Sequence, residues 1–152
     1  MAPRAKWSHA VMIAMETGPR IESVGSDYAA ALPATPAAVP EIRHAVVGVA
    51  RELGANAETC DAVAVAVSEA CTNVVMHAYD PSAATGRVVV AARQDDEGLR
   101  VMIRDSGHGM RPRADSPGLG LGLPLIAQLS DHLEVTRGPD GHGTELRLWF
   151  SL

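Results

Sequence analysis

The sequence predicts a single domain that combines helices with strands, and three observations lead to this prediction. The chain has 152 residues, enough for one hydrophobic core but hardly for a second. Two segments in its first half, 40–54 and 58–79, place apolar residues at the three- and four-residue intervals of a helix. Short segments rich in aliphatic and β-branched residues then predict strands at 87–95, 99–105, 132–138 and 144–152.

The charge and composition of the chain argue against several classes of function. A formal net charge of −5, without a clustered basic face, argues against nucleic-acid binding. The apolar runs 62–67 and 88–92 are far shorter than the ~18–20 residues that cross a bilayer, and the N-terminus is a poor signal peptide. On one helix Cys60 and Cys71 would lie ~16 Å apart, too far for a disulfide. These features predict a cytoplasmic protein with reduced thiols and no membrane segment.

The first part of the chain differs from the rest. Residues 1–26 show no sustained periodicity and contain Gly18-Pro19, so we expect a flexible or loosely docked segment without chemistry of its own. The folded domain is predicted over residues 27–152. It begins with a short edge strand at 28–32, after which prolines prevent regular pairing.

Breaker residues set the ends of the predicted helices. Pro40 suits the first turn of the first helix, which ends near Gly54. A short third helix is predicted over 123–130 with Pro124 in its first turn. The glycine- and proline-rich stretch 106–122 before it fits neither the helical nor the strand period.

The second predicted helix carries three polar residues at intervals of four, Glu69, Asn73 and His77. Each step of four turns about 40° around the helix axis, so the three side chains form one slightly twisting ridge. The ridge is either the solvated side of an amphipathic helix or a functional site. In the second case the Asn oxygen can coordinate a hard cation while the Glu accepts a proton from a nearby nucleophile.

Asp105 ends a predicted strand and begins the motif Asp-Ser-Gly-His-Gly. A carboxylate there can accept a hydrogen bond from an exocyclic amine, and Gly107 and Gly109 allow another molecule to approach the backbone closely. The same residues also form ordinary turns, so this motif alone does not separate a site from a loop.

Three alternating glycines, Gly118, Gly120 and Gly122, lead into the third predicted helix. They expose backbone N–H groups beside a helix N-terminus, which suits phosphate. The motif is not a Walker loop, because no Gly-Lys-Ser/Thr follows, nor a Rossmann fingerprint, because Leu123 occupies the place of the last glycine. A flexible linker is the alternative interpretation.

A last glycine motif, Gly143-Thr144, opens the final predicted strand. A Thr hydroxyl there can reach a base, but an ordinary hairpin turn explains the motif equally well. Other chemistries find less support. No Cys-x-x-Cys or His-Glu-x-x-His spacing indicates zinc, and no serine lies in a Gly-x-Ser-x-Gly elbow.

In this order the motifs resemble the ATP-binding boxes of the GHKL superfamily. The matching stretches are Glu69-Ala-Cys-Thr-Asn73-Val-Val-Met-His77-Ala78-Tyr79, Asp105-x-Gly107-x-Gly109, Gly118-x-Gly120-x-Gly122 and Gly143-Thr144. Each could occur by chance, but four in the correct order are a strong signal. The first is similar to the branch of bacterial anti-sigma factor serine/threonine kinases rather than to sensor histidine kinases. The resemblance covers about 28–152.

The resemblance implies an α/β (α+β) fold, a two-layer sandwich in which a mixed, mostly antiparallel sheet has helices on one face. ATP would lie between a helix and a lid. Asn73 would bind Mg²⁺ on the phosphates, and Glu69 would be the general base for a partner's Ser or Thr hydroxyl. His77 would pack or hydrogen-bond at the helix end rather than react.

The same resemblance assigns the remaining motifs to the nucleotide. Asp105 would accept a hydrogen bond from the adenine amine, with help from Thr144 directly or through water. Gly107 and Gly109 would line the adenine pocket. Gly118, Gly120 and Gly122 would form lid backbone near the phosphates.

The expected activity is that of a cytoplasmic ATP-dependent protein kinase that binds a sigma factor and phosphorylates an anti-anti-sigma protein of the STAS type. A homodimer is compatible with the family. The alternatives are a nucleotide-gated binding module without kinase activity and a stand-alone catalytic domain of the histidine-kinase type. Two departures from the family pattern stand out: residues 1–26 have no counterpart in it, and the lid is short, with Arg111 and Arg113 either near phosphate or on a solvated surface.

Overall fold

The computed structural model describes residues 22–24, 27–80, 86–107, 119–138 and 141–152. Its strands are β1 (Glu22–Val24), β2 (Asp27–Pro33), β3 (Arg87–Asp95), β4 (Gly98–Asp105), β5 (His132–Arg137) and β6 (Thr144–Ser151). Its helices are α2 (Ala38–Glu52), α3 (Ala57–Asn73), α4 (Leu119–Leu129) and the π-helical turn η1 (Val74–Ala78).

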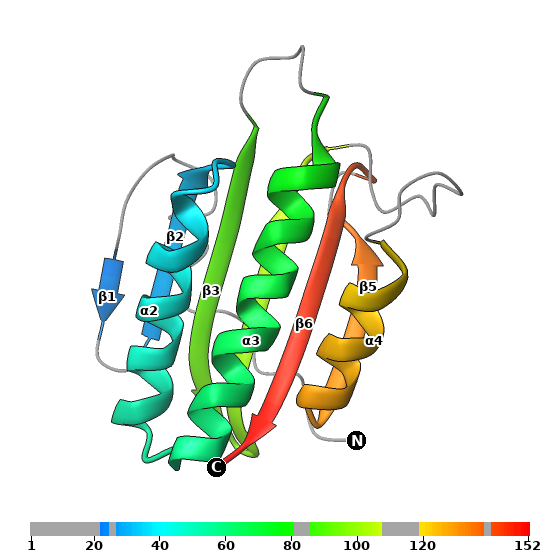
Figure 1. The fold of residues 1–152 in the computed structure, drawn as a ribbon. Coiled ribbons are helices and arrows are strands. Elements are labelled where there is room, and N and C mark those ends of the chain that lie inside the picture. Colours follow the sequence, from blue (N-terminus) through cyan, green and yellow to red (C-terminus); the bar gives the residue numbers. More distant parts are fainter. Residues whose placement is uncertain (1–21, 25–26, 81–85, 108–118, 139–140) are drawn as a thin grey trace.

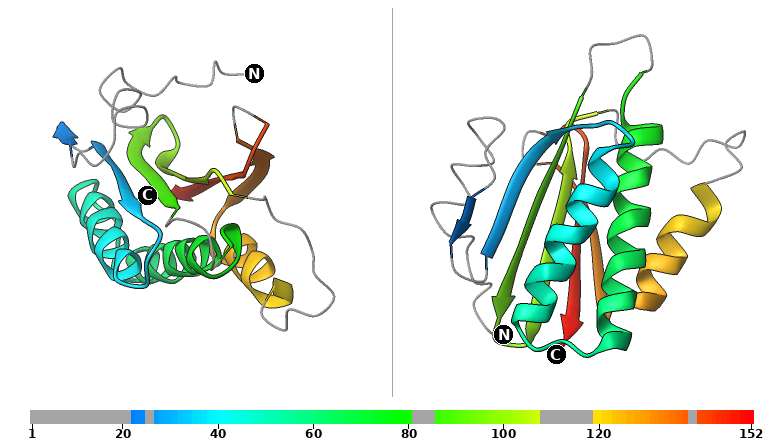
Figure 2. Two further views of the ribbon diagram at one scale, coloured as in Figure 1. Left: turned by 90° about the horizontal axis from the view of Figure 1, so that it is seen from above. Right: turned by 60° about the vertical axis from the view of Figure 1, so that its left-hand side comes forward.

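The described strands form one six-stranded sheet in the order β1-β2-β3-β4-β6-β5. Helices α2, α3 and α4 all lie on one face of this sheet, with α3 in the middle (Figures 1 and 2). The predicted two-layer sandwich with helices on one face is therefore confirmed. Every pairing among the described strands is antiparallel, so this sheet contains no parallel pair.

Alternation along the strands explains why the helices cover only one face. In β4 the side chains of Leu99, Val101 and Ile103 are buried in the main core beneath the helices. The residues between them point to the opposite face, where Met102 belongs to a second, small apolar cluster. Because successive side chains of a strand point to opposite faces, one strand serves both surfaces.

Helix α3 forms the centre of the helical layer. Its N-cap Asn56 accepts a hydrogen bond from the Thr59 backbone N–H at 2.8 Å. Small and β-branched side chains on one side of it are fully buried against α2 and the sheet, namely Val63, Ala66, Val67, Ala70 and Cys71. Cys60 and Cys71 are both buried and both free, as their spacing on one helix predicts.

By length and composition alone, the helical stretch Ala57–Ala78 could cross a membrane. The core helix of a globular protein meets the same criterion, and α3 has a buried stripe that packs within this domain. Its apolar character is therefore explained by the core that it helps to form.

Two strand predictions need correction. The stretch 28–32 was expected to be an edge strand, but β1 pairs with β2, so β2 is the second strand of the sheet. The three residues of β1 lie in the segment for which the sequence predicts no regular structure. A three-residue strand is too short to produce a periodic pattern and forms only because a paired partner is available.

Helix α4 begins at Leu119, earlier than the predicted start at 123. Gly120 and Gly122 therefore lie inside the helix, and Pro124 lies beyond its first turn. Glycine and proline are the weakest helix formers, so local propensity places the start too late. Packing of α4 against α3 compensates for this low propensity.

The predicted second helix is interrupted near its end. Regular α-helix stops at Asn73, and Val74–Ala78 form a π-helical turn before Tyr79 becomes extended. Such wide turns are rare and are frequently found at functional sites. This one separates Asn73 from the residues that contact the end of β4.

Candidate functional site

Four of the predicted site residues that the structure describes, Asn73, Asp105, Gly107 and Thr144, lie at one end of the sandwich. There α3 ends, β4 ends at Asp105 and β6 begins at Thr144, which is the upper end of the sheet in Figure 1. Because β4 and β6 are neighbouring antiparallel strands, the end of one lies beside the start of the other.

Asn73, the middle residue of the polar ridge, lies next to α4. Glu69 and Asn73 are both half-buried. A β-carbon added to Gly122 would lie 3.0 Å from Nδ2 and 3.3 Å from Oδ1 of Asn73, so the Asn73 amide faces the backbone of α4. Glu69 precedes Asn73 by one turn of α3, and Val65, one turn earlier, is an exposed apolar residue.

Asp105 is a buried carboxylate with only 5% of its surface exposed. Its Oδ1 accepts a hydrogen bond from the Gly107 backbone N–H at 2.9 Å. Burial raises the pKa of Asp105, because a charged carboxylate loses its water, while hydrogen bonds from the backbone N–H groups of Gly107 and Thr144 partly lower it again. A carboxylate has about four acceptor positions, so two such bonds leave capacity for a further donor.

Two glycines let the backbone segments of this site approach one another. Gly143 has φ of 69°, and a β-carbon there would collide with the carbonyl oxygen of Asp105. A β-carbon on Gly107 would collide with the carbonyl oxygen of Ala78 in η1. Gly143 and Ala78 therefore belong to the structural frame of the site, although the sequence pattern alone does not assign them a role.

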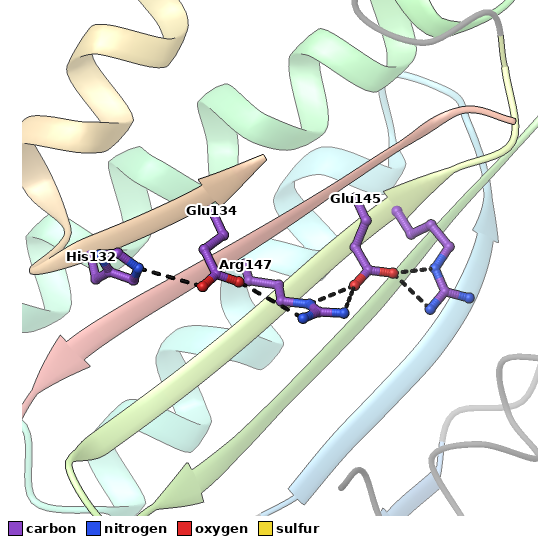
Figure 3. A network of polar contacts seen from close by, with 5 residues as sticks. His132, Glu134, Glu145 and Arg147 are labelled. Atoms are coloured by element: carbon purple, nitrogen blue, oxygen red, sulfur yellow. Dashed lines mark hydrogen bonds and ion pairs between the residues drawn. The ribbon is translucent and has the colours of Figure 1, made fainter. Parts of the chain in front are cut away.

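A network of ion pairs lies beside the site on the helix-free face of the sheet (Figure 3). Glu145 is 2% exposed and accepts from Arg104 Nε at 2.9 Å and from Arg147 Nε at 2.6 Å. Glu134 extends the network, with Arg147 Nη1 at 3.8 Å and His132 Nε2 at 3.6 Å from its carboxylate. Arg104 and Glu145 face each other across β4 and β6, so their fork-like contact stabilises the register next to Asp105 and Thr144.

Some predicted residues cannot be placed. Gly109, Gly118, Arg111 and Arg113 lie outside the described residues. Of the rest, Gly120 lies in the first turn of α4, Thr144 is buried, and His77 is half-buried in η1.

A metal at this site would depend on few protein ligands. Within the described parts of the chain, no group of three or more His, Cys, Asp or Glu side chains is arranged to hold an ion. The Asn73 amide oxygen at the end of α3 is of the hard kind that could serve as one ligand. Mg²⁺ suits such a site, because it commonly takes one or two protein oxygens and completes its shell with phosphates and water.

This fold is an α/β sandwich with a polar ridge on its central helix and a buried carboxylate at one end of the sheet. A comparison with protein families agrees, because the model of the histidine kinase-like ATPase domain matches residues 32–150. The chain belongs to this family.

Relatives of known name are similar to most of the chain. Serine-protein kinase RsbW of Halalkalibacterium halodurans is 31% identical over an alignment of 119 residues that covers 68% of this chain and 72% of that protein. Serine-protein kinase RsbW of Bacillus mycoides is 29% identical over the same length and covers 68% of this chain and 73% of its own.

Two solved structures are similar in fold. The RsbU and RsbW domains of Rv1364c from Mycobacterium tuberculosis match with a TM-score of 0.65 and 25% identity over 83% of this chain, which spans only 32% of that protein. The histidine kinase domain of the blue-light activated kinase EL346 from Erythrobacter litoralis matches with a TM-score of 0.53 and 26% identity, over 84% of this chain and 69% of that one.

Proposed function

We propose that this chain is an ATP-dependent protein-serine/threonine kinase of the anti-sigma factor type. It would transfer the γ-phosphate of ATP to a Ser or Thr of an anti-anti-sigma protein. The observation that carries the proposal is the position of Glu69 one helical turn before Asn73, whose amide faces Gly122 at the start of α4. Phosphoryl transfer needs a residue that orients the attacking hydroxyl next to the groups that hold the phosphates.

In the proposed reaction the Glu69 carboxylate takes the proton of the partner's hydroxyl. The hydroxyl oxygen forms a bond to the γ-phosphorus, the bond from that phosphorus to the β–γ bridging oxygen breaks, and ADP leaves. Backbone N–H groups at the N-terminus of α4 and the amide of Asn73 hold the phosphates. Most of the rate gain would come from placement, since phosphoryl transfer requires little covalent chemistry from the protein.

The adenine end of the site would be formed by Asp105. Its buried carboxylate would accept a hydrogen bond from the adenine amine. The backbone N–H of Gly107 donates to Oδ1 of the same carboxylate and holds it in place. Thr144 lies beside it at the start of β6 and would assist directly or through water. Mg²⁺, bound by the Asn73 oxygen and the phosphates, would neutralise part of their charge.

The proposed partners are a sigma factor, which the protein would sequester, and a STAS-type anti-anti-sigma protein, which it would phosphorylate. Relatives named as serine-protein kinases support this choice. The setting would be the cytoplasm, where both partners act.

The nucleotide site is tested first, by binding of a fluorescent ATP analogue with and without Mg²⁺. Wild type is expected to bind in a Mg²⁺-dependent way, Asn73→Ala to lose the Mg²⁺ dependence, and Asp105→Asn to lose affinity at either Mg²⁺ level. Absence of binding to wild type would refute the proposal.

The kinase step is tested by Glu69→Gln. Removing a general base is expected to lower transfer to a purified STAS-domain protein by about 100-fold or more while nucleotide binding is retained. Glu58→Gln is the matched control, because Glu58 is exposed in the first turn of the same helix. Wild-type transfer by Glu69→Gln would disprove the base role.

A second candidate is a catalytic domain of the histidine-kinase type, which the likeness to the Erythrobacter litoralis histidine kinase domain favours. Phosphate on a partner histidine is acid-labile, whereas phosphoserine and phosphothreonine survive acid. Acid treatment of the labelled product therefore separates the two candidates. Nucleotide-dependent partner binding without any label would instead indicate a pure binding module.

A further inference from the structure

Tyr79 joins the end of the central helix to the turn that follows β4. Its hydroxyl accepts a hydrogen bond from the Ser106 backbone N–H at 3.0 Å. The same hydroxyl donates to the carbonyl oxygen of Arg87 at 2.5 Å. One phenol oxygen therefore connects three segments: the residue after η1, the start of β3 and the residue after β4.

Glycines on both sides make this position possible. A β-carbon on Gly86 would run into the ring of Tyr79, and one on Gly107 would run into the carbonyl of Ala78. The Ala78-Tyr79 step is thus enclosed between the chain entering β3 and the chain leaving β4. A side chain on either glycine would push these segments apart.

The contact with Ser106 bears directly on Asp105. Tyr79 holds the backbone of the residue that follows Asp105, and the next residue, Gly107, donates its N–H to Asp105 Oδ1. The direction of the carboxylate therefore depends on a turn that is itself held by Tyr79. The Tyr79 ring is half-buried and lies outside the residues to which the nucleotide was assigned.

We propose that Tyr79 is a positioning residue for recognition of the adenine amine: its hydroxyl holds the Asp105-Ser106-Gly107 turn so that the Asp105 carboxylate meets the amine. This inference rests on the proposed function, since it assumes that Asp105 binds adenine. Tyr79 itself is extended and directly follows η1, the π-helical turn that continues the chain from Asn73.

The test compares the affinities of ADP and inosine diphosphate, which lacks the exocyclic amine, by displacement of a fluorescent ADP analogue. A hydrogen bond to a charged group corresponds to roughly tenfold to 150-fold in affinity, so wild type is expected to prefer ADP by about that factor. Tyr79→Phe is expected to reduce this preference by about fivefold or more, through weaker ADP binding with little change for inosine diphosphate.

The chain offers a matched control in its only other tyrosine, Tyr28. The Tyr28 hydroxyl is buried in the core and has no hydrogen-bond partner among the residues that the structure describes. Tyr28→Phe removes the same atom and is expected to leave the ADP preference unchanged. Circular dichroism and thermal unfolding of both variants check that they are folded.

If Tyr79→Phe fails to fold, Ser106→Pro tests the same contact with Tyr79 intact. Proline has no backbone N–H and so removes the donor of the hydrogen bond to the Tyr79 hydroxyl. Ser106→Ala keeps that N–H and serves as its control. A lowered ADP preference in Ser106→Pro but not in Ser106→Ala supports the inference.

The outcomes separate this inference from the proposed function. If wild type binds no ADP, both are wrong. If wild type prefers ADP and folded Tyr79→Phe keeps the full preference, only the role of Tyr79 is refuted. If Tyr79→Phe weakens both nucleotides equally, the residue is merely structural and the inference also fails.

Discussion

Asn73 of α3 and Gly122 of α4 lie in direct contact, and a β-carbon at Gly122 would stand 3.0 Å from the Asn73 amide nitrogen. That distance is tighter than most side-chain contacts, so any larger residue would push the Asn73 amide aside. The absence of a side chain at Gly122 therefore determines where the proposed magnesium ligand can lie.

Gly122→Ala is accordingly expected to trade affinity for stability. Alanine favours a helix over glycine by up to about 1 kcal/mol, so the melting temperature should rise or stay level. Mg²⁺-dependent nucleotide binding should weaken several-fold, because the Asn73 amide must move. Gly48→Ala on α2 is the control, since a β-carbon there meets nothing within 4 Å and should leave binding unchanged. Equal nucleotide affinity in both variants would contradict this expectation.

Asp105→Asn is expected to lower ADP affinity roughly tenfold or more while leaving the fold at least as stable at neutral pH. Burial raises the pKa of Asp105, so the folded protein binds this proton more tightly than the unfolded chain does. The cost of the buried charge is present at neutral pH and disappears as pH falls through the raised pKa toward 3.8, the ordinary pKa of an aspartate. The stability advantage of the variant should therefore shrink on acidification.

Thermal unfolding between pH 4 and pH 8 measures that difference. Asp61→Asn, which changes an exposed carboxylate on α3, controls for general charge effects. An advantage of Asp105→Asn that grows as the pH falls would show that burial is not the dominant effect on this carboxylate.

Glu145→Gln is expected to destabilise the protein by on the order of 2 kcal/mol, because it removes the charge that two arginines share. The figure lies below the usual cost of breaking a buried pair, since the side chains of Arg104 and Arg147 are 22% and 24% exposed. ADP affinity should fall as well, because this contact stabilises the register beside Asp105 and Thr144. Denaturant unfolding provides the measurement.

The comparison for this network is Glu134→Gln. Its carboxylate contacts His132 at 3.6 Å and Arg147 at 3.8 Å, both longer than the contacts of Glu145. We therefore expect the variant to lose less than about 1 kcal/mol of unfolding free energy. A larger loss at Glu134 than at Glu145 would mean that the outer end of the network contributes more.

The thiol of Cys71 is expected to resist alkylation in the folded protein. Burial raises its pKa to about 12, so almost no thiolate exists near pH 8. Stability should also fall as pH rises above 9.0, the ordinary pKa of a cysteine thiol, because the unfolded thiol then ionises while the folded one does not. Iodoacetamide labelling with and without denaturant tests the first point, and rapid labelling of Cys71 in native protein would refute it.

Much of the fold follows from local patterns. The alternation of 99–105 predicts a strand with one face in the core, and Leu99, Val101 and Ile103 are indeed buried beneath the helices. The helical periodicity of 58–79 likewise predicts α3. The sequence places the start of α4 too late and does not predict β1. These two errors have a common cause, since both elements depend on neighbours that their own residues do not encode.

For the candidate site too, the sequence and the tertiary structure contribute different information. The sequence by itself indicates the proposed chemistry, because side chains suited to accept a proton, coordinate a hard cation or accept a hydrogen bond from an amine are recognisable by type and spacing, as with Glu69, Asn73 and Asp105. Only the tertiary structure decided that Asn73 faces Gly122 and that Tyr79 holds Ser106. Such contacts join segments far apart in sequence, and they form when the hydrophobic core brings helix ends and strand ends together, which no local propensity specifies.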